Sequence, residues 1–404
     1  MTTDPADPAT HAPLALLREL LDGHTDRYDE RAILDLLAGA DAGVLNELLA
    51  GVDVDQLLGD VDNRLFGPDH EHELIELLAR TRRADLTRAN QAAVLHALQI
   101  GRTRERHEVA IRDMLLAVGG LELTRLKNEL NLRTDHHDLE ALVFQDVDDA
   151  GIREEILAHI AREAAVVGQL DERKVLCDID DTVKSAIHDS RWPRGTVYPG
   201  ILALLEALDI GPDDAPFSRG DLTFVTARPT DAFGLMERAS HEALTKAGIS
   251  ARTVLTGSLF ALHTHDAMAG KKLANIDDYR LLFPEYDLMF IGDSGQGDVE
   301  VGHRMYEAHP DAVRVVFIHD VKGLSAAERE ELRGERIYVV DTYVEAARLA
   351  HEYGLISERG LREVIGEVER LTAEVEFNSE EQRAETLALV QRDLAEAKAH
   401  LATP

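Results

Sequence analysis

Three short motifs combine the residue types that phosphoryl transfer requires. The first is DIDDT, in which Asp178 and Asp180 are one residue apart and follow an apolar run. The second is TARP, which begins at Thr226, and the third is GDSGQGD, which contains Asp293 and Asp298. Carboxylates can hold a divalent cation, and one of them can attack phosphorus once that cation relieves the repulsion between anions. The motifs therefore predict metal-assisted chemistry on a phosphate ester.

The spacing within DIDDT suits two roles. A second carboxylic acid two residues after a nucleophile can protonate the departing oxygen and then deprotonate the attacking water. A hydroxyl and a lysine ammonium can hold the other phosphoryl oxygens. The D-x-D pattern alone carries no weight, because DVD also occurs at 53–55, 60–62 and 146–148. Only DIDDT follows a predicted strand.

The elements that must position these motifs are short apolar runs that end in polar clusters. Such runs predict buried strands, with segments of helical pattern between them. This alternation is typical of a parallel sheet covered by helices on both faces, whose chemistry lies at the carboxyl ends of the strands. The five predicted strands are KVLCDI, DLTFVTA, YDLMFIGD, AVRVVFIHD and RIYVVD.

The hydrophobic period changes twice along the chain. Helical spacing dominates both before and after the strand-rich part. NEL at 46–48 recurs at 128–130 within a longer similarity, so two tandem helical units of about 80 residues are one interpretation and chance similarity is the other. We expect a flexible lead-in (1–12), an all-helical domain (13–170), an α/β domain (171–355) and C-terminal helices (356–404).

Composition limits the classes of partner. The 404 residues include 76 acidic and 43 basic residues, a formal net charge of −33, so the long-range field repels nucleic acid and anionic lipid surfaces. Cys177 is the single cysteine, which excludes an intrachain disulfide and fits a reducing compartment. The start of the chain lacks the pattern of a signal peptide, and no apolar run is long enough to span a membrane. We expect a cytoplasmic protein without a membrane anchor.

The motifs also resemble those of a known superfamily. DIDDTV, TARP and GDSGQGD are similar to the motifs of haloacid dehalogenase-like phosphatases, whose core is a doubly wound, Rossmann-like parallel sheet. More narrowly, DIDDTVKS, YPG at 198–200, the stretch 271–301 and VVFIHDV resemble the catalytic domain of the actin-patch-protein type of phosphatidate phosphatase. The resemblance extends from residue 172 to about 350. It implies conversion of phosphatidate to diacylglycerol with Mg²⁺.

The resemblance assigns roles to residues at matching positions. It implies that Asp178 is the nucleophile and that Asp180 is the general acid and base. It places the phosphate-binding hydroxyl at Thr226 and the phosphate-binding lysine at Lys272, with the neighbouring Lys271 as the alternative. Aspartate at position 180 favours rapid hydrolysis of the phosphorylated intermediate, as in a phosphatase.

The same resemblance implies a magnesium site. Its ligands would be Asp178, the backbone carbonyl of Asp180, and Asp293, while Asp298 would support the site or bind through water. One departure is TARP, because related lipid phosphatases have a serine-rich segment there. Arg228 would bring a cation that contacts a second anionic group of the substrate, or that pairs with a neighbouring acidic residue.

Two further hypotheses stay open at the level of the sequence. The same chemistry could act on a soluble phosphate ester, a phosphorylated nucleic-acid end or a phosphoprotein. Alternatively, residues 13–170 could bind a protein partner, so that the chain is a scaffold with a regulated phosphatase module. Neither the natural substrate nor the oligomeric state follows from the sequence, and nor does the presence of a cap over the site.

Overall fold

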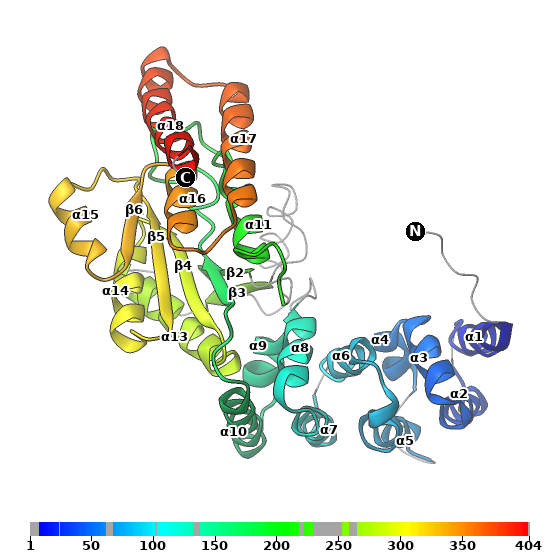
Figure 1. Ribbon diagram of the computed structural model, residues 1–404. Helices are drawn as coiled ribbons and strands as arrows, with labels where there is room; N and C mark the ends of the chain where they lie inside the picture. The colour runs from blue at the N-terminus through cyan, green and yellow to red at the C-terminus, as the bar shows by residue number, and fades with distance from the viewer. Residues whose placement is uncertain are drawn as a thin grey trace. The chain divides into compact units, whose positions relative to one another are not determined.

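The computed structural model describes residues 8–23, 25–61, 68–101, 103–131, 138–217, 222–229, 253–257 and 265–402. For residues 8–11, 226–229, 253–257 and 265–271 it describes the backbone alone. The chain divides into two compact units (Figure 1). The helical unit ends at Val167, and the sheet unit begins at Gly168.

The helical unit consists of two rows of helices. In one row α2, α5, α7 and α10 pack neighbour on neighbour, and in the other α1, α3, α4, α6, α8 and α9 follow one another (Figure 1). Two π-helical turns extend α5 and α9. The helices are α1 (Pro8–Leu20), α2 (Arg27–Gly39), α3 (Ala42–Ala50), α4 (Val54–Asp60), α5 (His70–Glu76), α6 (Arg88–Ala97), α7 (Glu105–Leu116), α8 (Gly120–Asn131), α9 (Leu139–Ala141) and α10 (Ala150–Val167).

Aspartate starts many of these helices. Its short carboxylate accepts hydrogen bonds from the first backbone amides of a helix, which have no partner within the helix itself. Asp53 does so for α4, which explains one of the DVD copies outside the strand-rich part. Asp26 and Asp29 form a capping box at α2. Part of the acidic excess is therefore structural.

Contacts within the helical unit recur at a regular sequence separation. His70 pairs with Glu30 at a separation of 40 residues, and His96 pairs with Asp55 at a separation of 41. The backbone amide of Asp149 donates to Glu108, again across 41 residues. These three contacts thus span about half the distance in the chain at which the sequence similarity was noted. The two tandem units of about 80 residues stay a prediction.

The N-terminal segment differs from the expectation in one respect. Helix α1 begins at Pro8, inside the segment 1–12 that we expected to be a flexible lead-in. Proline is favoured in the first turn of a helix, where its missing N–H would have no partner anyway. Residues 1–7 lie outside the described part.

The sheet unit is built on a six-stranded parallel sheet, which confirms the predicted fold class. The strand order is β3-β2-β1-β4-β5-β6, so the order reverses between β1 and β4. In open sheets of this kind, side chains that follow the strands meet in the crevice at this reversal. The strands are β1 (Arg173–Cys177), β2 (Leu222–Pro229), β3 (Thr253–Gly257), β4 (Asp287–Asp293), β5 (Val313–His319) and β6 (Ile337–Val340).

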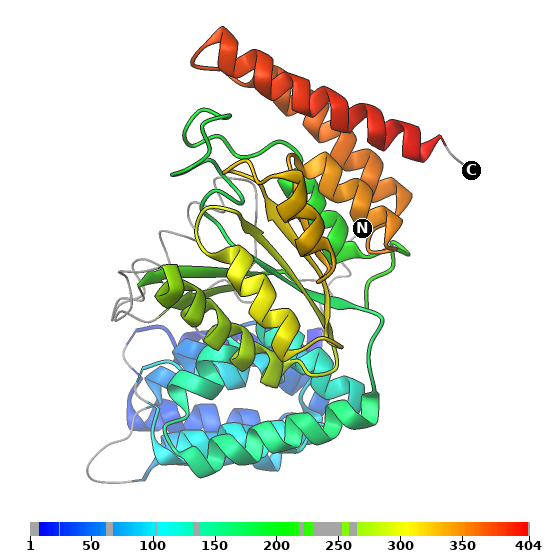
Figure 2. The same cartoon turned by 90° about the vertical axis from the view of Figure 1, so that its left-hand side faces the viewer.

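Helices cover both faces of this sheet. Helices α13 and α14 pack on each other and on the strands, while α11, α16 and α17 pack together on the opposite face (Figures 1 and 2). No helix in the described ranges is long and apolar enough to cross a membrane. The helices are α11 (Ile201–Ile210), α13 (His265–Leu282), α14 (Asp298–Ala308), α15 (Ala326–Arg333), α16 (Tyr343–Glu352), α17 (Glu358–Glu374) and α18 (Glu380–Leu401).

One strand was missed by the pattern. The sequence predicts five strands, but β3 is a sixth and pairs in parallel with β2. Its five residues, TVLTG, contain no continuous apolar run. Because β3 lies at the edge of the sheet, its formation depends on the hydrogen bonds to β2 rather than on burial of both faces.

The predicted C-terminal helices are confirmed and pack on the sheet unit. Leu361, Val364 and Val368 of α17 are buried in the same core as residues of α11 and α16. Helix α18 packs on α16, with Val390 and Ala397 buried. The described contacts therefore place these helices on the core of the sheet unit.

We predict that the turn before α11 tolerates no side chain at Gly200. Gly200 has φ +91°, and a Cβ there would lie 2.5 Å from Cγ2 of Val368 on α17. We expect Gly200→Ala to lower the free energy of unfolding by about 3 kcal/mol, through backbone strain and overpacking. Urea unfolding followed by the fluorescence of Trp192, the single tryptophan, measures it.

Gly354→Ala is the matched control for this substitution. Gly354 has φ +66° but open space where the Cβ would go, so strain alone should cost about 1 kcal/mol. Equal losses in the two variants would contradict close packing of α17 against the turn.

Candidate functional site

The site lies where the strand order reverses. Asp178 follows the last residue of β1, and Asp293 is the last residue of the adjacent β4. The backbone amide of Asp178 donates to the carbonyl of Ile291 at 2.9 Å, which continues the ladder between these strands. Both carboxylates are buried, with Asp178 4% and Asp293 0% exposed. The first and third motifs, 115 residues apart in the chain, therefore share one crevice.

A lysine lies between two of the buried carboxylates. Nζ of Lys272, on α13, is 2.8 Å from Oδ1 of Asp178 and 2.5 Å from Oδ1 of Asp298. Lys272 is itself 3% exposed. Since the backbone alone is described for Lys271, the structure identifies Lys272 as a lysine that reaches Asp178. The choice of phosphate-binding lysine stays a prediction.

Burial and like charges shift the pKa values in this cluster. Burial raises the pKa of Asp178 to about 7, against the opposing effect of Lys272. Burial, together with the charges of Asp298 and Asp178, raises the pKa of Asp293 to about 9. For Lys272, burial lowers the pKa, but the two carboxylates outweigh it and raise the pKa. The protein therefore concentrates more negative charge here than its own cation balances.

Asp293 has an oxygen that lacks a partner. Its Oδ1 accepts a hydrogen bond from the amide of Gly295, but Oδ2 has no hydrogen-bond partner among the described residues. One carboxylate oxygen each of Asp178, Asp293 and Asp298 lie within 4.8 Å of one another. A buried, unpaired carboxylate oxygen is costly unless a cation binds it. The donor set fits a hard divalent cation such as Mg²⁺, which prefers oxygen ligands.

Asp298 is already engaged within the protein. Its Oδ1 accepts from Lys272, and its Oδ2 accepts from the backbone amide of Asp293 at 3.2 Å. Asp298 begins α14, and the turn before it contains Gly297 at φ +91°. Both oxygens of Asp298 therefore have donors, and Asp298 holds Lys272 and the end of β4, whereas Oδ2 of Asp293 has no donor among the described residues.

The other predicted residues lie at or near the same sheet edge. Asp180 is partly buried, and its backbone carbonyl accepts a hydrogen bond from Nε2 of Gln296 at 3.0 Å. Thr226 and Arg228 belong to β2, which pairs with β1, but their side chains lie outside the described part. The proposed roles of these residues stay predictions.

Two further residues of the first motif have contacts that sequence reasoning did not identify. Oγ1 of Thr182 donates to Oδ2 of Asp178 at 3.3 Å, and Thr182 is fully buried. Asp181 has φ +60° and accepts hydrogen bonds from the backbone amides of Ala186, Ile187 and His188. The aspartate that follows the predicted acid and base therefore holds the chain that we call the flap, residues 185–196.

His319 connects the flap to the sheet. This last residue of β5 is buried, and burial lowers its pKa to about 4, so the imidazole is neutral. Nη2 of Arg191 lies 3.1 Å from Nε2 of His319, and since arginine can only donate, Nε2 must accept. The proton is then on Nδ1, which donates to the carbonyl of Asp181 at 3.1 Å. The sequence signal for this contact was the HD pair that ends VVFIHD.

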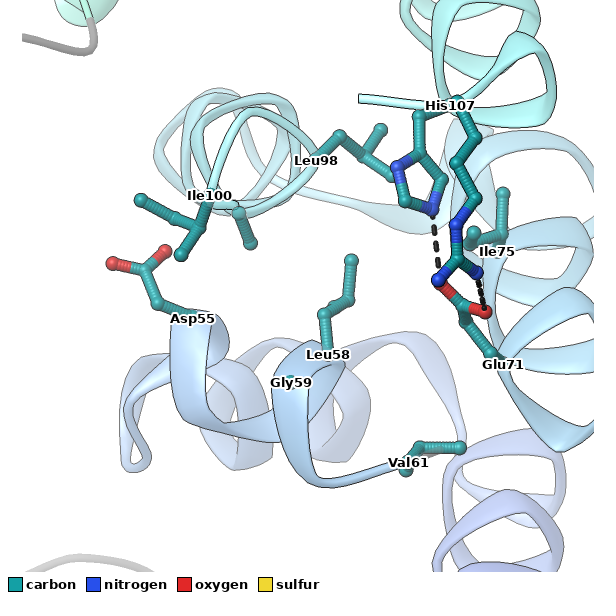
Figure 3. A pocket seen from close by; sticks show the side chains of 11 residues that line it. Asp55, Leu58, Gly59, Val61, Glu71, Ile75, Leu98, Ile100 and His107 are labelled. Atoms are coloured by element: carbon teal, nitrogen blue, oxygen red, sulfur yellow. Dashed lines mark hydrogen bonds and ion pairs between the residues drawn. The ribbon is translucent and has the colours of Figure 1, made fainter. Parts of the chain in front are cut away.

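A cavity in the helical unit offers a contrast. It has a volume of about 200 Å³ and lies between α4, α5 and the segment that leads into α7 (Figure 3). Glu71, a partly buried carboxylate in its lining, is paired with Arg104, Arg106 and His107. The acidic group here is balanced by cations of the protein itself, unlike Asp293 in the sheet unit.

The comparison with known families agrees with this location. Residues 173–320 match the family model described as the catalytic domain of phosphatidate phosphatase APP1. This segment is a phosphatase domain of the APP1 type. The resemblance noted in the sequence is thereby confirmed. Comparison with curated proteins and with solved structures gives no match.

The matched segment covers part of the sheet unit. The APP1-type domain, as matched, contains β1 to β5 and ends at Asp320. Strand β6 and helices α15 to α18 follow it in the chain and complete the sheet and its core.

We predict that the buried lysine is essential to the stability of the APP1-type domain. Lys272→Met would leave Asp178 and Asp298 without their cation, so we expect the free energy of unfolding to fall by about 3 kcal/mol. Urea unfolding in the presence of EDTA, followed by Trp192 fluorescence, measures the change. Lys271→Met is the comparison. A larger loss in Lys271→Met than in Lys272→Met would contradict the assignment of the central cation to Lys272.

Proposed function

We propose that this protein is a magnesium-dependent phosphomonoester hydrolase that acts through an aspartyl-phosphate intermediate, with phosphatidate as its substrate. The observation that carries the proposal is the buried group formed by Asp178, Lys272 and Asp293. It lies in a segment that matches a phosphatidate phosphatase domain. A nucleophile, a fixed cation and an unpaired carboxylate oxygen are the parts that the reaction requires.

In the first step a carboxylate oxygen of Asp178 attacks phosphorus, and the bond from phosphorus to the ester oxygen breaks. Asp180 donates its proton to the departing alcohol. Lys272 already lies 2.8 Å from Asp178, so its ammonium offsets negative charge where the phosphoryl group arrives. Thr226, on the adjacent strand β2, would donate its hydroxyl proton to a phosphoryl oxygen.

In the second step water attacks the phosphorus of the aspartyl phosphate. Asp180, now a carboxylate, accepts a proton from this water, and the bond between phosphorus and Asp178 breaks. Inorganic phosphate leaves and both aspartates return to their initial states. The placement of Asp180 two residues after Asp178 is consistent with this double use.

A magnesium ion fits the residues that are present. Asp178, Asp293 and the carbonyl of Asp180 would hold it, and when bound it would relieve the repulsion between the carboxylates and the phosphate. Asp298 holds Lys272 and the backbone amide of Asp293 in place, and we assign it a supporting role.

Phosphatidate is proposed on the family match, and the net charge of −33 opposes approach to an anionic bilayer. Delivery of a lipid substrate would then need a local surface or a partner. A soluble phosphate ester is the alternative substrate with the same chemistry.

We predict that phosphate release depends on Asp178. In mixed micelles with phosphatidate and Mg²⁺, the wild type should release inorganic phosphate, and Asp178→Asn should lower kcat by at least about 10³-fold because the nucleophile is lost. Asp311→Asn, an exposed aspartate of the same unit, is the control. A panel of soluble phosphomonoesters identifies the substrate class. Full turnover in Asp178→Asn would refute this nucleophile.

We predict that Mg²⁺ stabilises the protein and that this effect depends on Asp293. Mg²⁺ at 100 times its Kd should raise the free energy of unfolding of the wild type by about 2.7 kcal/mol. Asp293→Asn should lose most of this gain, because a ligand oxygen is removed. Thermal unfolding with MgCl₂ or EDTA measures both. An equal Mg²⁺ effect in the two proteins would show that the ion binds elsewhere.

A further inference from the structure

The flap is closed at its base and carries a histidine toward the site. The backbone amide of Ser185 donates to the carbonyl of Thr196 at 2.9 Å, and that of Gly195 donates to the carbonyl of Ser185 at 2.7 Å. Between these residues the chain forms a loop whose first part is wrapped around the carboxylate of Asp181. The loop therefore has a fixed end next to the first motif.

His188 is a flap residue whose side chain lies close to Asp181 and Asp293. Its Nδ1 is 3.1 Å from Oδ2 of Asp181, and a Cβ built on Gly295 would lie 2.9 Å from the same nitrogen. One carboxylate oxygen each of Asp181 and Asp293 and one ring nitrogen of His188 lie within 4.8 Å of one another. Because Nδ1 faces Asp181, Nε2 on the other side of the ring is directed away from it, and the side chain is 32% exposed. His188 thus presents a polar edge beside the buried carboxylates.

The second part of the flap is held by α18. Oγ1 of Thr386 donates to the backbone carbonyl of Arg191 at 2.6 Å, and Thr386 is 1% exposed. One turn earlier on the same helix, Nε2 of Gln382 donates to the carbonyl of Ser190 at 2.8 Å. Two successive carbonyls of the flap are therefore bound by a helix that begins almost 200 residues later in the chain.

The tryptophan of the flap is packed into the same interface. Trp192 is 6% exposed, and its ring centroid is 5.9 Å from that of Phe377, which precedes α18, and 6.2 Å from that of Tyr198. Burial of an aromatic side chain adds a hydrophobic contribution to the two hydrogen bonds. The flap is thus fixed on one side by Asp181 and on the other by the C-terminal helices.

We propose that α18 is a working part of the phosphatase site, and that Thr386 and Gln382 are positioning residues that hold the flap so that His188 contacts the bound phosphate ester. This inference rests on the proposed function. Both residues lie outside the segment that matches the APP1 family, so that match does not account for them. Fixing a loop in its binding conformation lowers the entropy lost when substrate binds, which acts mainly on KM.

The test compares Thr386→Val with Thr386→Ser in the full chain. Valine removes the hydroxyl donor to Arg191, and serine keeps it. With the phosphomonoester that the wild type turns over best and Mg²⁺, we expect Thr386→Val to raise KM about tenfold with kcat changed less than about twofold. Thr386→Ser should restore the wild-type values. Gln382→Ala removes the neighbouring hydrogen bond from α18 to the carbonyl of Ser190, and it replaces Thr386→Val in this test if that variant does not fold. Glu385→Ala, exposed on α18, is the control.

A double-mutant cycle shows whether α18 acts through the histidine. If it does, His188→Ala combined with Thr386→Val should have the same KM as His188→Ala alone. Acrylamide quenching of Trp192 should increase in Thr386→Val and return to the wild-type value in Thr386→Ser. Independent, multiplicative effects of the two substitutions on KM, or an unchanged KM in Thr386→Val, would overturn the inference while the wild type remains an active phosphatase. A wild type that hydrolyses no phosphomonoester would overturn the proposed function, and this inference with it.

Discussion

The architecture of the site depends on bringing buried carboxylates together at one edge of a parallel sheet. Asp178, Asp293 and Asp298 lie within reach of a single ion, in surroundings that water does not screen. Such an arrangement is unfavourable unless cations balance it. Lys272 supplies one positive charge from α13. The Asp293 oxygen that has no partner within the described ranges indicates where another is needed. This imbalance is the physical basis for our proposal that the site binds a divalent cation.

The second constraint is that the chain around this cluster must be held without filling it. Asp181 and Asp298 do this with carboxylates that accept hydrogen bonds from backbone amides, so acidic residues of the first and third motifs serve as structural anchors. His319 links the carbonyl of Asp181 to Arg191, and Thr386 links Arg191 to the last helix. The helices after residue 355 are therefore connected to the site by a continuous series of hydrogen bonds.

In the helical unit, aspartate, glutamate and histidine have different roles. Its aspartates cap helices, and His70 and His96 each pair with a carboxylate about 40 residues earlier in the chain. Glu71 in its cavity is balanced by arginine and histidine. A high density of acidic residues therefore does not by itself indicate a metal site. The decisive difference is whether a buried carboxylate is left without a partner.

The sequence by itself determined the fold class, and it predicted which carboxylates would lie at the strand ends. Apolar runs that end in DIDDT and GDSGQGD predicted strands with carboxylates at their ends, and parallel pairing forces those ends together. Strand β3 was not predicted, because an edge strand is stabilised by pairing rather than by its own apolar pattern. Only the tertiary structure decided that Lys272 contacts two aspartates and that α18 binds the flap. These contacts join residues 26, 94 and 195 positions apart, and no local periodicity encodes which distant side chain will pair with a buried charge or a backbone carbonyl.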